Sequence, residues 1–401
     1  MRMSYMCRGR TALVNGLIVL QKEVIQNHAI IINEKKIEDI VPLASISREK
    51  DTFEIIDCSD KYIIPGLIDI HSDMIETVIV PRKGLIFDNK IALYEADRQL
   101  ISQGITTIYH SISIANSTIC NRTRTLTVPE MVRIGDAINQ EDAHLLIHHR
   151  FHARLELNTI EALELIIDRI NSKKIHELSI MDHTPGQGQY SNLETFKVEI
   201  RKQYGEIPEY QMNAIIKECQ KKPTLSSEQI NRLLECANTM SIPIAFHDVE
   251  TDKQLEFMKR HNIQISEFPL TAYIAAKAAE NNFFNLVGAP NILRGGSHNK
   301  NASALELVES GCANIICSDY YSPSFLPSIF LLPRITQVTL PEAVSFATYY
   351  PAKAVHLDHL YGSIAPGKNA DILIVDLKSE IPKVVIAFVD GKKKYQIFYE
   401  D

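Results

Sequence analysis

What this sequence lacks excludes several classes of protein. It has no apolar run near the roughly 18 residues that a membrane-spanning helix needs. Lys and Arg number 42 against 49 Asp and Glu, a formal charge of −7, without the basic excess that neutralises phosphates in nucleic-acid-binding proteins. We therefore expect neither nucleic acid nor a membrane as a partner. Glycine (16) and proline (17) are too few among 401 residues for a collagenous or low-complexity chain, and 45% of the residues are hydrophobic. This composition predicts a globular protein with a large core.

Cysteine is present, but never as a CxxC pair. The seven cysteines are an odd and scattered set: Cys7, Cys58, Cys120, Cys219, Cys236, Cys312 and Cys317. Such a set argues against a disulfide framework and against a structural zinc cluster. Residues 12–20 loosely imitate a signal peptide, but Asn15 and Gly16 interrupt them, and we interpret them as a β-strand. We therefore expect a cytoplasmic protein.

The rhythm of apolar runs divides the chain into three parts. Short β-branched runs separated by turns fill residues 11–64, and short runs return from Gly362 onward. Between them, apolar strands alternate with helix-length amphipathic segments, which is the pattern of parallel strands with helical crossovers. The two terminal segments are each too small for a core of their own. We therefore predict an α/β protein with a (β/α)8 TIM barrel over residues 65–355 and a small β-sandwich domain from residues 1–64 and 356–401.

Ionisable residues follow the apolar strands of the predicted barrel. They are His71, Asp73, His183, His247 and Asp319. In enzymes with a (β/α)8 barrel, the active site lies at the carboxyl ends of the strands. Because alternate residues of a strand face the same side, the side chains of His71 and Asp73 are expected to point the same way. A single His is more often a satisfied core residue, and Asp319 alone could be a helix N-cap. Together, at successive strand ends, these residues favour metal ligands.

Residues 147–157 alternate in polarity along a predicted strand. One face carries His148, Arg150, His152, Arg154 and Glu156, and the other carries Ile147, His149, Phe151, Ala153, Leu155 and Leu157. The alternative is an exposed basic strand. Because the flanking α/β pattern buries this strand within the barrel, we predict that the polar face points to the barrel axis and brings Glu156 among the other ligands.

These motifs resemble the metal-dependent amidohydrolase superfamily over essentially the whole chain. The resemblance rests on the strand-end residues above and on residues 362–372, which return the chain to the β-sandwich. Narrower stretches are similar to the phosphonate-metabolism branch of that superfamily, in the carbon–phosphorus lyase pathway; they are residues 65–73, 181–190, 246–251, 288–298 and 318–321. The resemblance implies a hydrolase that cleaves a ribosyl 5-triphosphate and releases diphosphate.

The resemblance also assigns roles to the candidate ligands. It implies two divalent metal ions, zinc with manganese or iron as alternatives, held by His71, Asp73, Glu156, His183, His247 and Asp319. Asp73 stands where the commoner pattern has a second His, and Met74 stands where the branch favours Asn. No Lys lies in residues 144–157, so Glu156 takes the bridging place of a carboxylated Lys. Asp319 is then the catalytic base that accepts a proton from the attacking water.

Several other residues are candidates for holding an anionic substrate. A loop before a predicted helix contains Arg294, Gly295, Gly296 and His298, where backbone N–H groups and a guanidinium suit phosphate. The alternative for this loop is a plain connection. Arg82 and Lys83 form a second cationic pair just past the first metal motif. Gln187 and Tyr190 either contact the ribose or phosphate or form a lid, and His110 is either a substrate contact or a core residue.

Three functions stay open on the sequence alone. The first is hydrolysis of a sugar triphosphate, which makes a phosphorylated sugar the small-molecule partner. The second is hydrolysis of a cyclic amide or an N-acyl amino acid with the same metals. The third is a non-catalytic homologue, which the intact ligand set argues against. The loop at Arg294 favours the first function, because a neutral amide has no need of it. A homo-oligomer also stays open.

Overall fold

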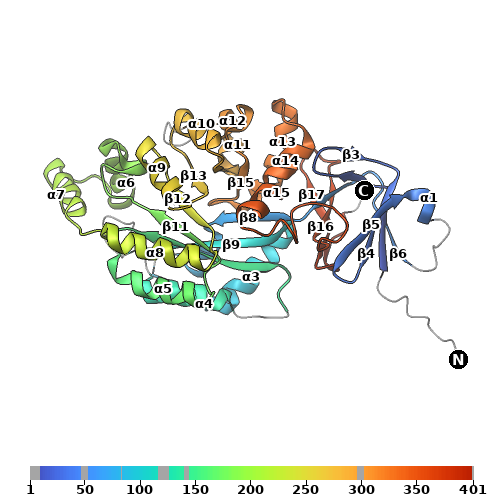
Figure 1. Cartoon of the computed structure of the whole chain (residues 1–401), viewed down its shortest axis with the longest axis horizontal. Helices are drawn as coiled ribbons and strands as arrows, with labels where there is room; N and C mark the ends of the chain where they lie inside the picture. The colour runs from blue at the N-terminus through green and yellow to red at the C-terminus, as the bar shows by residue number, and fades with distance from the viewer. Residues whose placement is uncertain are drawn as a thin grey trace.

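The computed structural model describes residues 10–46, 53–82, 84–115, 126–139, 144–295 and 302–399. At its centre lies an eight-stranded parallel sheet whose strands are neighbours in chain order (Figure 1). The strands are β8 (Leu67–Ser72), β9 (Ile105–Ile114), β10 (His148–Glu156), β11 (Glu177–Met181), β12 (Ile244–His247), β13 (Ile265–Glu267), β14 (Phe284–Gly288) and β15 (Ile315–Cys317). Ser72 forms a parallel bridge with Asp319, just past β15, so the first and last strands meet. The predicted (β/α)8 barrel is confirmed.

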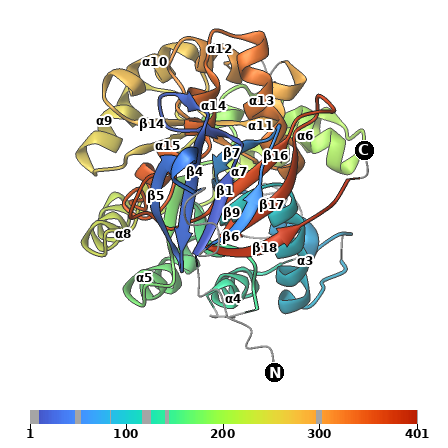
Figure 2. The ribbon, with the colours of Figure 1, turned by 90° about the vertical axis from the view of Figure 1, so that its right-hand side faces the viewer.

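Helices follow the strands and surround the barrel, as the view from the small sheets shows (Figure 2). In the first half they are α2 (Met74–Ile79), α3 (Asn89–Ser102), α4 (Val128–Ile138), α5 (Leu163–Asn171) and α8 (Ser227–Thr239). In the second half they are α9 (Asp252–Arg260), α10 (Ala272–Glu280), α11 (Ala289–Arg294), α12 (Ala304–Glu309), α13 (Phe325–Ile335), α14 (Leu340–Phe346) and α15 (Tyr349–Ala354). Their apolar faces pack on the outward residues of the sheet, which together form the largest buried core.

Strand β10 shows how the sequence sets this packing. Phe151 is fully buried and faces α4, where a Cβ on Gly135 would lie 2.2 Å from the Phe151 ring. Arg154 points to the other side, toward the barrel axis, and donates to Asp73, which follows β8, two strands away in the sheet. Successive residues of a strand face opposite sides. The predicted alternation of residues 147–157 is therefore confirmed.

Two small sheets at the amino end of the barrel strands combine both ends of the chain. Their strand orders are β5-β4-β1-β6 and β18-β17-β16-β7-β2-β3. These strands are β1 (Arg10–Val14), β2 (Leu17–Val19), β3 (Val24–Ile25), β4 (His28–Asn33), β5 (Lys36–Pro42), β6 (Glu54–Asp57), β7 (Tyr62–Pro65), β16 (Ile372–Asp376), β17 (Lys383–Val389) and β18 (Lys392–Gln396), with the short helix α1 (Leu43–Ile46) after β5. Leu13 and Ile30 of the first sheet share a buried core with Ile63, Ile372 and Phe388 of the second. The β-sandwich from both termini is confirmed.

The chain passes from the sandwich into the barrel within a few residues. β7 pairs with β16 in the small sheet, and β8 begins in the barrel at Leu67. On the return, α15 ends at Ala354, and the next strand is β16 in the small sheet. The division of the chain at 64/65 and 355/356 stays a prediction.

A helical excursion covers the opposite end of the molecule. Between β11 and β12 lie the short helix η3 (Gly188–Tyr190), then α6 (Leu193–Tyr204) and α7 (Glu209–Gln220). Figure 1 shows α6 and α7 at the end away from the small sheets. Their own buried cluster includes Tyr190, Phe196 and Met212. The excursion therefore lies at the end of the barrel that carries the carboxyl ends of the strands.

Two further sequence expectations concern membranes and cysteines. Within the described residues, every helix is too short or too polar to cross a membrane. Cys58, Cys236, Cys312 and Cys317 are free thiols, whereas Cys219 is disulfide-bonded. That bond was not expected from the scattered cysteine pattern.

Candidate metal centre

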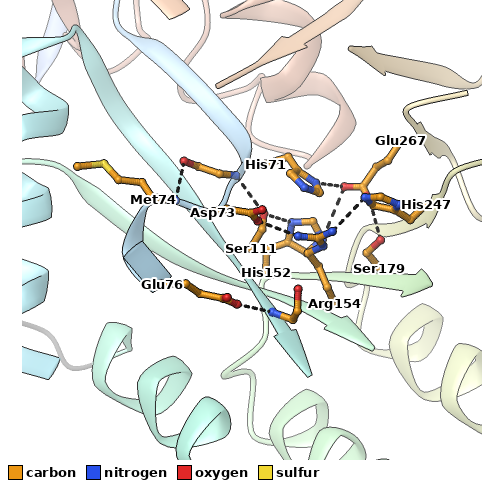
Figure 3. Close-up of polar contacts among 12 residues, drawn as sticks. His71, Asp73, Met74, Glu76, Ser111, His152, Arg154, Ser179, His247 and Glu267 are labelled. Atoms are coloured by element: carbon orange, nitrogen blue, oxygen red, sulfur yellow. Dashed lines mark hydrogen bonds and ion pairs between the residues drawn. The ribbon is translucent and has the colours of Figure 1, made fainter. Parts of the chain in front are cut away.

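Histidines and carboxylates meet at the carboxyl end of the barrel (Figure 3). The strand ends place them: His71 is the penultimate residue of β8, and His247 and Glu267 are the last residues of β12 and β13. Among the described residues, two groups here each bring three possible ligand atoms within 4.8 Å of one another. They are His71 with His152 and Glu267, and His183 with His247 and Asp248.

The first group is buried at the barrel axis. His71 Nδ1 lies 2.7 Å from Glu267 Oε1, and Ser179 donates to the other oxygen of Glu267 at 2.5 Å. His152 Nδ1 lies 3.1 Å from the carbonyl oxygen of Ile70, so Nδ1 carries the proton and Nε2 keeps its lone pair. Burial lowers the pKa of His152 to about 3. The ring is therefore neutral, which is the form that binds a metal.

The second group is built around Asp248. Its Oδ2 lies 3.1 Å from His247 Nδ1 and 3.4 Å from His183 Nε2. These three atoms are buried and have no hydrogen-bond partner in the described part of the chain. Asp248 holds this position with a positive φ of 56°, a backbone conformation that non-glycine residues adopt uncommonly.

Glu156 orients one histidine of the second group. Its two oxygens accept from the His183 backbone N–H at 2.6 Å and from His183 Nδ1 at 2.8 Å. Burial lowers the pKa of His183, but the charges of Glu156 and Asp248 outweigh it and raise that pKa to about 9. A carboxylate that holds the far nitrogen of a ligand histidine is common around metals. The bridging role of Glu156 stays a prediction.

Arg154 lies between the two groups. Its Nη1 donates to Asp73 at 2.7 Å, and its Nη2 donates to His247 Nε2 at 3.1 Å. The rings of His71 and His247 are 5.6 Å apart, so the groups are neighbours in one site. The structure thus pairs Asp73, a predicted ligand, with a guanidinium, and the ligand role of Asp73 stays a prediction.

Asp319 closes the barrel at the same end. Its N–H donates to the carbonyl oxygen of His71, and its own carbonyl oxygen accepts from the N–H of Asp73. Gly288 leaves it room, because a Cβ there would lie 3.2 Å from Asp319 Oδ2. Burial, followed by the negative charge of Asp73, raises the pKa of Asp319 to about 7. A carboxylate with such a pKa is suited to general acid–base chemistry near neutral pH.

The donor set fits a divalent metal. The two groups offer imidazole nitrogens and carboxylate oxygens without thiolate, which suits zinc and related ions. His152 Nε2, His183 Nε2 and Asp248 Oδ2 are buried without a hydrogen-bond partner in the described ranges, and such atoms are costly unless something binds them. The chain therefore carries buried histidine and carboxylate groups whose donors are consistent with a divalent metal, and the number of ions stays a prediction.

Three residues of these groups were missing from the predicted ligand set. His152 was placed on the correct face of its strand without a ligand role. Glu267 ends the three-residue strand β13, and the rule that identified His247 and Asp319 would also have identified it. Asp248 directly follows His247, and its orientation depends on a positive φ that sequence patterning does not reveal.

The predicted phosphate contacts are only partly described. Arg294 is the exposed last residue of α11, which begins directly after β14, and Gly295 follows it in a left-handed conformation. Arg82 is exposed beyond α2. Gly296, His298 and Lys83 lie outside the described residues. Phosphate binding by all of these stays a prediction.

Gln187 and Tyr190 lie on the turn that follows β11. Gln187 is exposed, and Tyr190 N–H donates to its carbonyl oxygen. The Tyr190 ring is buried, lies 6.1 Å from the His183 ring and packs edge-on against Phe196 of α6. Tyr190 therefore joins the excursion to the metal site, and its contact with a substrate stays a prediction.

His110 faces away from the site, which favours the second of its two predicted roles, that of a core residue, over the substrate contact. β9 runs from Ile105 to Ile114, so His110 lies in the middle of the strand and not at its end. Its ring is fully buried and stacks on His149, with His110 Nε2 2.8 Å from His149 Nδ1. His149 Nε2 in turn lies 3.0 Å from Asp97 of α3. His110 is a core residue between the barrel and its helices.

Sequence comparisons agree with this architecture. A model of the amidohydrolase family matches residues 62–397. The chain is 29% identical over 347 residues to alpha-D-ribose 1-methylphosphonate 5-triphosphate diphosphatase of Escherichia coli (strain K12), covering 85% of this chain and 90% of that protein.

Solved structures show the same fold at low identity. N-acetylglucosamine-6-phosphate deacetylase from Pasteurella multocida matches with a TM-score of 0.62 and 13% identity, over 96% of this chain and 99% of that one. An adenosine deaminase from Xanthomonas campestris with bound zinc matches with a TM-score of 0.59 and 14% identity, over 96% and 93%. At such identities the likeness concerns the fold alone.

Proposed function

The chain belongs to the amidohydrolase family, and from that premise we propose that it is a metal-dependent hydrolase that cleaves a ribosyl 5-triphosphate and releases diphosphate. The observation that carries the substrate class is the 29% identity to the diphosphatase, which extends over 85% of this chain and 90% of that protein. The proposed substrate is a phosphorylated sugar.

The site has groups for each part of this reaction. Divalent ions held by the two histidine and carboxylate groups would acidify a water and offset the charge of the phosphates. Asp319, with its pKa raised to about 7 by burial, would take the proton from the attacking water. Water then adds to phosphorus as the P–O–P bond breaks, and diphosphate leaves.

Fixed cations suit an anionic substrate at this end of the barrel. Arg154 is buried between the two ligand groups, where its guanidinium is held by Asp73 and His247. Arg294 is exposed at the end of α11 and is free to reach a triphosphate tail. We propose that Arg154 stabilises charge near the reacting phosphorus and that Arg294 holds the outer phosphates.

Phosphorus NMR tests the proposal directly. Metal-loaded protein is incubated with a ribosyl 5-triphosphate and, separately, with cyclic amides and N-acyl amino acids. We expect the triphosphate signals to be replaced by those of diphosphate and a ribosyl monophosphate. Opening of a cyclic amide with the triphosphate left intact would overturn the proposal in favour of an amide hydrolase.

A further inference from the structure

We infer that a cavity at the amino end of the barrel binds a multiply charged, phosphate-bearing small molecule. The cavity has a volume of about 560 Å³, within the range of sites for small ligands. It lies where the start of β10 and the turn before β11 meet the ends of β17 and β18 from the sandwich. Neither the metal centre nor the proposed reaction uses it.

The cavity is lined by cations in a chain that is acidic overall. Its permanently charged cations are Lys35, Arg150, Lys173, Lys392 and Lys394, and its one carboxylate is Asp390. Lys35 lies 3.7 Å from that carboxylate, so the acid is already compensated. Arg150, Lys173 and Lys392 form no ion pair with any residue that the structure describes. Such a surplus of cations in a concave site suits a polyanion.

His176 adds a neutral donor to the wall. The backbone N–H of Phe151 donates to His176 Nδ1 at 3.1 Å, so the ring proton is on Nε2. Burial, followed by the charge of Arg150, lowers the pKa of His176 to about 4. The Nε2–H has no partner among the described residues, and it can donate to a phosphate oxygen beside Arg150.

A metal cation is the alternative ligand for this end. His148, Asp371 and Asp390 bring possible ligand atoms within 4.8 Å of one another. Asp371 accepts from the Asp390 backbone N–H, however, and Asp390 accepts from Asn369. Each carboxylate therefore has one oxygen bound by the protein, whereas Asp371 Oδ2 and His148 Nε2 are buried without a hydrogen-bond partner among the described residues. The lysines around them repel a cation. The charges favour an anion.

The cavity is separate from the metal centre. None of its lining residues belongs to either ligand group. Along β10, Arg150 is two residues from His152 of the first group, roughly 7 Å at about 3.3 Å per residue, and six residues from Glu156. A ligand in the cavity therefore contacts residues other than the metal ligands and Asp319. The inference therefore stands whether or not the proposed reaction is correct.

Titration calorimetry on the metal-loaded full chain tests the inference, with inorganic phosphate, diphosphate and ribose 5-phosphate as separate probes. The variants are the exposed pair Lys173→Ala/Lys392→Ala and the single change Arg150→Gln. Lys393→Ala is the matched control, because Lys393 lies between two cavity lysines on β18 but pairs with Glu54 at 3.7 Å. We expect diphosphate to bind the wild type. Its affinity should fall at least tenfold in both cavity variants and change less than twofold in the control.

The three probes also separate the sources of the phosphate. Stronger binding of ribose 5-phosphate than of diphosphate identifies an organic phosphate as the ligand, and the reverse identifies a free polyphosphate. Diphosphate that binds all variants equally occupies another site and overturns the inference. Absence of binding to the wild type, or binding of zinc that His148→Gln abolishes, overturns it as well.

Discussion

The two ends of strand β10 carry opposite charge on the same face. At the carboxyl end, Glu156 joins carboxylates and histidines that fit a divalent cation, whereas at the amino end Arg150 joins lysines that fit an anion. Alternation along the strand decides which side chains reach the axis. The neighbouring elements decide what each end of β10 can bind. The carboxyl end lies beside the ends of other barrel strands, and the amino end lies beside the sandwich.

Removing a histidine ligand should have the largest effect of any change at the carboxyl end. His183→Asn deletes a buried nitrogen aimed at Asp248, so metal content and turnover should fall together, turnover by on the order of a thousandfold. Elemental analysis and a kinetic assay on one preparation measure both. His261→Asn, at the end of α9, is the control. Full metal content with normal turnover in His183→Asn would remove the second group from the metal site.

Asp319→Asn should lower turnover by roughly 10²- to 10⁴-fold. An amide cannot take the proton from the attacking water, whereas the backbone bonds of residue 319 to β8 do not depend on its side chain. Substrate affinity should therefore change little. Separate measurement of kcat and KM checks this, and a variant with unchanged kcat would exclude Asp319 as the base.

Arg294→Ala should reduce kcat/KM for a triphosphate by roughly tenfold to a hundredfold, because it deletes a charge-assisted contact worth about 1.5 to 3 kcal/mol. Metal content should stay constant. Arg260→Ala, in the last turn of α9, controls for a general loss of positive charge. Equal kinetics in the wild type and Arg294→Ala would mean that this loop does not hold the phosphates.

Asp97→Ala should affect stability and spare the metal centre. Asp97 is buried behind β10 and accepts from the backbone N–H groups of Leu146 and Ile147 and from His149. Leaving these donors unpaired should cost about 2 to 3 kcal/mol of unfolding free energy, measured by urea denaturation. Glu95→Ala, half-buried on the same helix and hydrogen-bonded there to Arg98 and Gln99, should lower the midpoint much less. A loss of metal by folded Asp97→Ala would show that the two faces of β10 are coupled.

Sequence patterning could predict the barrel and the polar face of β10, because the periods of strands and helices are properties of the local chain. It could also place His183 and His247 at strand ends. It could not decide between the two roles of His110, because only the full length of β9, which extends to Ile114, places this residue in the middle of a strand. The pairing of Arg154 with Asp73 could not be predicted, because it joins a residue of β10 to the residue just past β8, two strands away in the sheet.

The amino-end cavity was beyond sequence patterning for a similar reason. Arg150 was expected to face the axis, but the lysines of β18 come from the other end of the chain. Only the way the sandwich docks on the barrel brings them together. Long-range charge clusters of this kind leave no local pattern.

Anomalous diffraction at the zinc edge, from crystals of the zinc-loaded protein, tests the central claim most directly. The account predicts zinc at about 2.0 to 2.1 Å from the nitrogens of His183 and His247 at the carboxyl end of the barrel. The same map shows whether Glu156 bridges two ions or orients His183. A second peak beside His71, His152 and Glu267 would establish the two-metal site. Zinc found only beside His148, Asp371 and Asp390, or nowhere in the barrel, would contradict the account.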